Sequence, residues 1–253
     1  MQTQLDLDAF KIVYQDSHLV AIHKPAGLLV HRSPIDKHET LFAVQLTRDT
    51  VGQMVYPIHR LDKATSGLLL FALDSNTARQ LGQQFTEHTI EKTYLAICRG
   101  WTEPTGLIDK PLKYQKDRIA DKLKKEQLEP QTAITAYKTL AHTTVDHTIG
   151  KFDQQRYSLV ELKPKTGRKH QIRRHLNHIS HPIIGDVKYG DRHHNHFFNE
   201  WLEQHRLYLA ATSLQFIHPS TKETVTIEAP LEKSFQYAID RLDFTQQEQK
   251  ESQ

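Results

Sequence analysis

The chain has 253 residues, and 38% of them are hydrophobic, which is enough to bury one large core or two small ones. Charged residues make up 25% of the sequence, near the average for globular proteins, and this composition excludes wholesale disorder. The 33 Lys and Arg residues against 30 Asp and Glu residues give a formal net charge of +3, which by itself identifies no binding partner.

The sequence contains a single cysteine, Cys98, which excludes an intrachain disulfide and a zinc site built from cysteines. The first residues, MQTQLDLDAFK, lack the basic and apolar regions of a secretory signal. No apolar run approaches the ~18 residues that a membrane span needs. These features predict a soluble cytoplasmic protein.

The N-terminal part of the chain predicts strands and a helix before a buried strand. Residues 11–30 alternate in places between polar and apolar and contain Pro25-Ala26-Gly27, which favours two short strands and a turn. A helix is expected over about 39–51. The run Leu68–Leu73 is short, continuous and apolar, and turn-forming residues flank it, which is typical of a fully buried strand.

Beyond this run the sequence favours strands that follow one another, with few helices between them. Asp74 or Ser75 can cap a helix over about 76–85. The region Lys110–Pro130 is dense in charges of both signs, and we interpret it as a surface excursion. Further strands are expected at 91–99, 132–140, 157–162, 207–217 and 223–227, and a closing helix near 232–242. This order predicts an α+β fold in one domain over 1–245, followed by a disordered tail at 246–253.

A second amphipathic helix is expected to open at Thr166-Gly167. Ile172, Leu176 and Ile179 recur there at i, i+4 and i+7 and give one apolar face. Between residues 163 and 185 the sequence contains six cations and no carboxylate: Lys163, Lys165, Arg168, Lys169, Arg173 and Arg174. Such a segment can bind phosphate or clamp a carboxylate, although a solvated basic helix face explains the charges equally well.

A loop carboxylate, Asp62, directly precedes the predicted buried strand in the segment HRLDKATSG. At the rim of a cleft such a group can act as nucleophile, acid or base. Taken alone, it can equally cap a turn or pair with Arg60 or Lys63. Tyr94, in the segment EKTYL, taken alone is more often a core or interface residue than a catalytic one.

Seventeen histidines raise the alternative of a metal hydrolase, with a dense tract at His193–His196. The sequence contains no HExxH, and the histidines at 170, 175, 178 and 181 are spaced by five, three and three residues. Neighbouring cations also oppose a divalent ion. No metal is therefore predicted.

The chain resembles the RluA family of RNA pseudouridine synthases over nearly its whole length. Four segments that occur in the family's order carry the resemblance: LVAIHKPAGLLVH, HRLDKATSGLLLFA, EKTYLAICRG and TGRKHQIRRHLNHISHPIIGDVKYGD. The GRKHQIRRH segment and the short chain are most similar to the TruC branch, which modifies the T-stem uridine 65 of tRNA. The resemblance implies the pseudouridine synthase catalytic fold, with a mixed, mostly antiparallel central sheet, and no additional S4-type domain.

The resemblance also implies roles for single residues. Asp62 would be the nucleophile, and Arg168 would pair with it and hold it ionised. Tyr94 would stack on the flipped uracil and accept the C5 proton, and Arg60 would enter the RNA stack in place of the target uridine. Arg173 would bind phosphate instead. Lys169, Arg173 and Arg174 are the further predicted RNA contacts.

The implied reaction breaks an N-glycosidic bond, rotates uracil and forms a C–C bond, with no net gain or loss of electrons. It therefore requires no redox cofactor, nucleotide or metal, and a carboxylate nucleophile can carry it. The expected partner is tRNA, and the expected state is a monomer without a small-molecule cofactor. The alternatives are a synthase for 23S rRNA or another tRNA site, and an RNA-binding module without catalysis.

Overall fold

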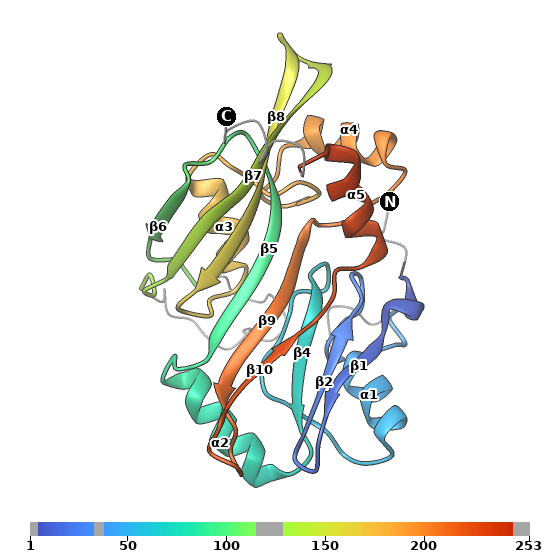
Figure 1. Ribbon diagram of the computed structural model, residues 1–253, viewed down its shortest axis with the longest axis vertical. Helices are drawn as coiled ribbons and strands as arrows, with labels where there is room; N and C mark the ends of the chain where they lie inside the picture. The colour runs from blue at the N-terminus through green and yellow to red at the C-terminus, as the bar shows by residue number, and fades with distance from the viewer. Residues whose placement is uncertain (1–4, 33–37, 115–128, 245–253) are drawn as a thin grey trace, which may run out of the picture.

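The computed structural model describes residues 5–32, 38–114 and 129–244 and contains a ten-stranded sheet (Figure 1). The main path of the sheet runs β1-β2-β4-β9-β5-β8-β7-β6, with β3 paired to β4 and β10 to β9. The strands are β1 (Lys11–Gln15), β2 (Leu19–Lys24), β3 (Tyr56–Pro57), β4 (Ser66–Ala72), β5 (Glu91–Arg99), β6 (Thr105–Asp109), β7 (Ile134–Ile149), β8 (Phe152–Pro164), β9 (Leu209–Ile217) and β10 (Thr224–Glu228). Among the strands of the described residues, only β4 and β9 pair in parallel, so the predicted mixed, mostly antiparallel α+β sheet is confirmed.

In the described ranges, five α-helices cover the sheet: α1 (Ala43–Val51), α2 (Ser75–Thr86), α3 (Gln171–His178), α4 (Arg192–Trp201) and α5 (Lys233–Leu242). In Figure 1, α1 and α2 lie at the end of the molecule that contains β1, β2 and β4, whereas α4 and α5 lie at the opposite end. None of the helices in the described part of the chain is long and apolar enough to cross a membrane.

The predicted buried strand is confirmed as β4, in which every residue is buried. It pairs with the fully buried β2, so both strands lie in the core, as their continuous apolar sequences require. The predicted cap of the following helix is also present, because the Asp74 side chain accepts a hydrogen bond from the Thr77 backbone N–H at 2.8 Å.

The parallel contact between β4 and β9 depends on a glycine. Gly67 has a φ of 105°, and a Cβ at this position would lie 2.0 Å from the carbonyl oxygen of Ala211. Only a residue without a side chain allows the two backbones to approach so closely. This contact fixes the start of β4, and hence the loop that precedes it.

Two elements of the second half differ from the sequence-based expectations. The predicted strands at 132–140 and 157–162 extend into one long hairpin, β7–β8, whose polar outer part has little apolar alternation. The histidine tract forms α4, for which no helix was predicted. Asp191 caps this helix by accepting a hydrogen bond from the His193 N–H at 2.9 Å. His194 is buried, and its Nδ1 lies within hydrogen-bond distance of the Tyr157 hydroxyl, at 3.0 Å. Most of the Lys110–Pro130 excursion and the tail at 246–253 lie outside the described residues.

Candidate active site

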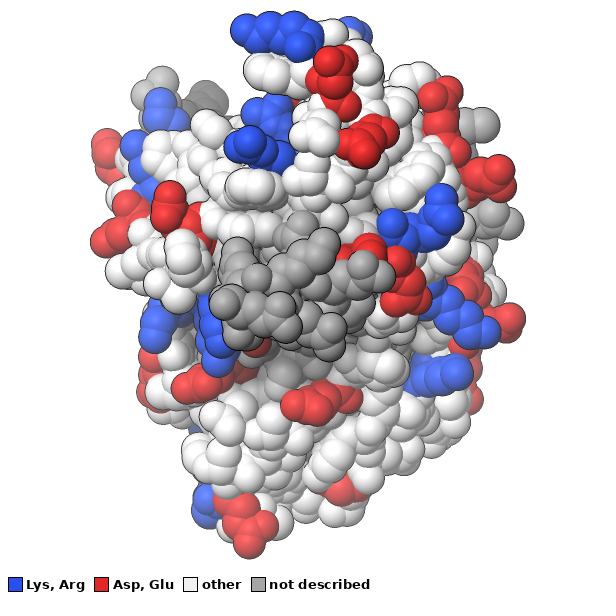
Figure 2. All heavy atoms as spheres, turned by 45° about the horizontal axis from the view of Figure 1, so that its top comes forward, with Lys and Arg blue, Asp and Glu red and all other residues white. Residues whose placement is uncertain are grey.

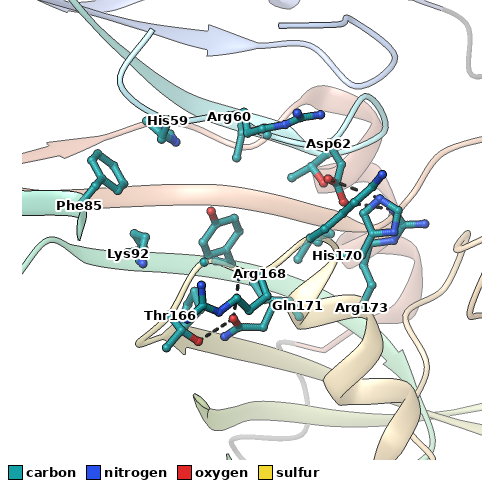
Figure 3. Close-up of a pocket in the computed structure, with 18 of the residues that line it drawn as sticks. His59, Arg60, Asp62, Phe85, Lys92, Thr166, Arg168, His170, Gln171 and Arg173 are labelled. Atoms are coloured by element: carbon teal, nitrogen blue, oxygen red, sulfur yellow. Dashed lines mark hydrogen bonds and ion pairs between the residues drawn. The ribbon is translucent and has the colours of Figure 1, made fainter. Parts of the chain in front are cut away.

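A pocket of about 870 Å³ lies where the loop before β4 faces β5 and the start of α3 (Figure 3). Its volume is within the range of about 300–1,000 Å³ that is typical of small-ligand pockets. The loop contributes Asp62 to its lining, β5 contributes Lys92 and Tyr94, and the segment between β8 and α3 contributes cationic residues. Several predicted site residues, far apart in the sequence, therefore share one cavity.

Asp62 is held at the pocket wall by a buried guanidinium. Its Oδ2 accepts a hydrogen bond from Nη1 of Arg173 at 3.1 Å, and its Oδ1 lies 3.8 Å from Nε2 of His170. The Asp62 side chain is 24% exposed, so it remains open to a ligand, whereas that of Arg173 is only 9% exposed. Burial lowers the pKa of His170 to about 4, so this ring is neutral at pH 7.

A second carboxylate fixes the orientation of Arg173. The Asp186 carboxylate accepts hydrogen bonds from Nε and Nη2 of Arg173 at 2.7 and 2.8 Å. It also accepts hydrogen bonds from the backbone N–H groups of Lys188 and Tyr189. Burial alone would raise the pKa of Asp186, but the hydrogen bonds and charge of Arg173 outweigh it and hold this pKa below its usual value. Because one edge of the guanidinium is anchored in this bidentate pair, Nη1 remains directed at Asp62.

The prediction that Arg168 is the ion-pair partner of Asp62 is corrected by this geometry. Nε of Arg168 donates to the Thr132 carbonyl oxygen at 3.0 Å, and its backbone N–H donates to the side chain of Gln171. The position at which α3 begins explains why Arg173, and not Arg168, contacts Asp62. α3 begins at Gln171 after His170, whose φ of 55° turns the chain, so Arg168 lies in the preceding loop and Arg173 in the helix.

A buried ammonium supports the loop that carries Asp62. Nζ of Lys24 donates to the carbonyl oxygens of Pro25, Leu28 and Lys63, at 2.8, 2.8 and 3.2 Å. Burial lowers the pKa of Lys24 to about 7, with the negative charges of Glu232 and Asp62 opposing this shift. Three acceptors use all three N–H donors of the ammonium form, so Lys24 ties the turn after β2 to the residue next to Asp62.

Replacing Lys24 with Met is expected to destabilise the protein by about 2–3 kcal/mol, because buried carbonyl groups lose their donor. Chemical denaturation of the Lys24→Met protein measures this change, and Lys11→Met, at an exposed position of β1, is the matched control. Equal stability of the two variants would contradict a supporting role for Lys24.

A buried ion pair ties the C-terminal part of the chain to the same region. Arg206 pairs with Glu232 and also donates to the Ser66 hydroxyl at 2.9 Å. Glu232 in turn accepts the backbone N–H of Ala26 at 2.9 Å. The turn after β2 and the start of β4 are therefore both anchored to residues near α5.

Tyr94 lines the pocket on β5, opposite Leu162 of β8 and Ala211 of β9. Burial, together with the negative charge of Asp62, raises the pKa of its phenol well above the usual value. Tyr94 is therefore a protonated phenol at pH 7.

His59 and Phe85 form an aromatic wall of the pocket. The two rings stack with centroids 5.1 Å apart, and Nε2 of His59 accepts the Leu70 backbone N–H at 3.0 Å. Burial, aided by the charge of Lys92, lowers the pKa of His59 to about 3, so this ring is neutral. It is the structural partner of β4 rather than a proton carrier.

The other predicted RNA-contact residues differ in whether they line this pocket. Arg60 and Lys169 are exposed and line the pocket, whereas Arg174 does not line it and donates to the Lys113 carbonyl oxygen at 3.0 Å. On the face shown in Figure 2, cations and carboxylates alternate instead of forming a patch of one sign. Among the described residues, no group of three or more His, Cys, Asp or Glu side chains is placed to hold a metal ion.

Sequence reasoning did not assign roles to four residues that build the site: Lys24, Lys92, His170 and Asp186. Lys24 precedes a Pro-Ala-Gly turn, and Asp186 follows Gly185 in the segment GDVKYGD. A glycine that allows backbone contact next to a carboxylate is the signal that could have identified Asp186. The Gly185 Cβ position lies 1.7 Å from the Arg206 carbonyl oxygen.

Comparison with known proteins agrees with this arrangement. The model of the family described as RNA pseudouridylate synthase matches residues 18–178. A Vibrio parahaemolyticus protein named tRNA pseudouridine synthase C is 50% identical over 237 residues, which cover 94% of this chain and 96% of that protein. A protein of the same name from Haemophilus ducreyi is 52% identical over 225 residues, covering 89% of this chain and 92% of its own length.

A solved structure shares the architecture. Human RNA pseudouridylate synthase domain containing 4 superposes with a TM-score of 0.68 at 27% identity, and the match covers 92% of each chain. The matched family region contains Asp62, Tyr94 and Arg173, which line one pocket. The chain therefore belongs to the RNA pseudouridylate synthase family, as an RluA-type RNA pseudouridine synthase.

Proposed function

We propose that this enzyme converts a uridine of tRNA, uridine 65 in the T stem, to pseudouridine, with Asp62 as its nucleophile. The observation that carries the proposal is the presentation of a partly exposed Asp62 carboxylate beside Tyr94, in a pocket where a buried Arg173 orients it. The names of the relatives support tRNA as the substrate. The enzyme acts as a monomeric catalytic domain without a small-molecule cofactor.

Asp62 begins the reaction by attacking the target nucleotide, either at C1′ of the ribose or at C6 of the base. Attack at C1′ breaks the bond to N1 and leaves the electron pair on uracil, whereas attack at C6 moves the C5–C6 π electrons toward C5 and O4. On either route the N1–C1′ bond is broken, the uracil turns in the pocket, and C5 bonds to C1′. Asp62 leaves as a free carboxylate, from C1′ when C5 displaces it or from C6 by elimination. Arg173 acts on the first step by pairing with the Asp62 carboxylate and directing it at the substrate.

Tyr94 stacks on the uracil and accepts the C5 proton late in the reaction, while its own phenol proton passes to N1, the nitrogen that the broken glycosidic bond leaves free. The charge of Asp62 is one cause of the raised pKa of Tyr94. Once Asp62 is covalently bonded to the substrate its negative charge is gone, and that contribution to the pKa disappears. Ionisation of Tyr94 is therefore less strongly opposed while the covalent bond exists, although burial continues to oppose it.

Base flipping brings the target to this pocket. A uridine in a stem is unreachable, and its eversion costs a few kcal/mol of stacking and pairing. Arg60, exposed at the pocket rim, enters the RNA stack in its place and restores part of the lost stacking.

Release of tritium from tRNA labelled at uridine C5 tests the proposal, because isomerisation exchanges this hydrogen with water. Wild-type enzyme should release one tritium for each modified tRNA, and mapping of the product should place pseudouridine in the T stem. Modification of 23S rRNA or of another tRNA position in the same assay would contradict the proposed target. Absence of release from any RNA would contradict Asp62 catalysis.

Arg60→Ala is expected to slow modification of folded tRNA far more than that of a short single-stranded oligonucleotide with the same uridine. The reason is that only the folded substrate must be unstacked, and loss of one stacking contact costs about 1–3 kcal/mol. Initial rates on the two substrates measure the difference, with Arg79→Ala, on the surface of α2, as control. Equal losses on both substrates would rule out the stacking role.

A further inference from the structure

Lys92 is a buried cation in the pocket to which the reaction as described assigns no role. Its side chain enters the cavity from β5, two residues before Tyr94, and only 8% of the residue is exposed. Because residues two apart on a strand share a face, Lys92 and Tyr94 both line the pocket from the same strand.

No protein group in the described part of the chain compensates the Lys92 charge, since its ammonium makes no hydrogen bond or ion pair there. Burial is the cause that lowers its pKa, and no carboxylate opposes the shift. The nearby His59 ring is neutral, and its Nε2 is already occupied by the Leu70 N–H. An unpaired cation in such a position costs stability unless a ligand provides its partner.

Lys92 and Asp62 lie at opposite ends of the pocket. In Figure 3, Asp62, His170 and Arg173 lie together at one end, whereas Lys92 lies beside His59 and Phe85 at the other. The electrostatics agree, because the charge of Asp62 acts on Tyr94 but is not among the causes that shift Lys92. Tyr94 therefore lies within the field of the Asp62 charge, and Lys92 lies outside it.

The depth of Lys92 decides which part of an RNA it can reach. Two other cations that line the pocket, Arg60 and Lys169, are exposed and can contact backbone phosphates of a bound RNA. Lys92 is too deep for this role, and only an everted base enters so far. A uracil whose ribose faces Asp62 has its carbonyl edge directed toward the far end.

We propose that the Lys92 ammonium donates a hydrogen bond to a carbonyl oxygen, O2 or O4, of the everted uracil and stabilises the negative charge that develops there. This inference rests on the proposed function, but it holds for either first step. Departure of N1 from C1′ places an electron pair on N1 that spreads to the carbonyl oxygens, and attack at C6 places one on C5 and O4. Lys92 transfers no proton and forms no covalent bond. It is thus a catalytic residue in addition to Asp62 and Tyr94.

The test is the single-turnover rate of Lys92→Met with saturating tritiated tRNA, measured beside the dissociation constant for the same tRNA. We expect the rate to fall by about 10²-fold, as for the loss of one donor to a developing oxyanion, with the dissociation constant nearly unchanged. Lys11→Met is the matched control and should equal wild type in both.

Thermal unfolding provides an independent readout. Because Lys92→Met removes a buried charge without a protein partner, its Tm should rise above that of wild type while its rate falls. A lysine with a purely structural role would give a lower Tm instead. A Lys92→Gln variant, which keeps a donor but not the charge, should fall between Met and wild type in rate.

Each other outcome overturns the assignment. If Lys92→Met bound tRNA more weakly but kept the wild-type saturated rate, Lys92 would be a phosphate contact. If the variant kept both the wild-type rate and the wild-type dissociation constant, Lys92 would have no role in the reaction. If wild-type enzyme releases no tritium, the proposed function itself fails. If wild type is active and Lys92→Met equals it, only the present inference fails.

Discussion

Asp62→Asn should lower the rate of tRNA modification by at least about 10⁴-fold, the scale of losing one member of a catalytic group that forms or supports the covalent bond. Asparagine has the same shape but no charge, so the nucleophile disappears while the pocket keeps its form. The stability should change little, because Arg173 keeps its bidentate pair with Asp186. Tritium release and chemical denaturation measure the two effects on one preparation.

Asp49→Asn is the control for this variant, since Asp49 forms only a surface ion pair with Arg48 on α1. A large loss of stability in Asp62→Asn would show that the charge of Asp62 supports the fold. Near wild-type activity in the same variant would exclude Asp62 as the nucleophile and remove the basis of the proposed mechanism.

Arg173→Met is expected to damage both stability and catalysis. The substitution leaves Asp186, whose side chain is 1% exposed, as a buried charge without its cation, at a cost of about 3–5 kcal/mol. It also leaves Asp62 without the guanidinium that orients it. Denaturant titration and single-turnover rates of the purified variant measure these losses.

The double variant Arg173→Met/Asp186→Asn separates the two effects. Removing the orphaned charge should recover much of the stability, whereas the activity should stay low because Asp62 still lacks its partner. If activity returned together with stability, Arg173 would act only through the fold.

The pH dependence of this pair has a defined sign. Because the folded pKa of Asp186 is below the usual Asp value, its stabilising contribution is complete above the unfolded pKa and is lost as pH falls through the folded one. The stability difference between wild type and Asp186→Asn should therefore narrow on acidification.

The local structure around the site was largely predictable from sequence. The apolar run at 68–73 is short and bounded by turn-forming residues, which favours a strand buried on both faces, and Asp74 follows it as the N-cap of the next helix. Asp62 could therefore be placed at a cleft rim. These inferences depend on neighbours in sequence and on burial, which a single chain displays.

The choice between Arg168 and Arg173 was not predictable, because it depends on where the helix starts. Sequence pattern placed the start at Thr166-Gly167, but the αL conformation of His170 delays it to Gln171. That shift of about one turn decides which guanidinium faces Asp62. A tertiary contact between residues 111 positions apart sets this choice, and no local pattern encodes it.

The helix α4 was missed for a related reason. Its sequence RHHNHFFNEW shows polar histidines where a helix usually shows apolar periodicity. Packing supplies what the pattern lacks, since Phe197 and Phe198 are buried and His194 is satisfied by the Tyr157 hydroxyl. Buried polar pairs of this kind are visible only once both partners are placed.

The ion pair between Arg206 and Glu232 has a consequence for biosynthesis. The turn after β2 and the start of β4 are among the first segments to leave the ribosome, yet their anchors, Ser66 to Arg206 and Ala26 to Glu232, are translated late. A nascent chain that ends before α5 therefore lacks a finished catalytic centre. The catalytic centre therefore depends on contacts that span 140 and 206 positions of the chain, and these contacts can form only after Glu232 has been translated.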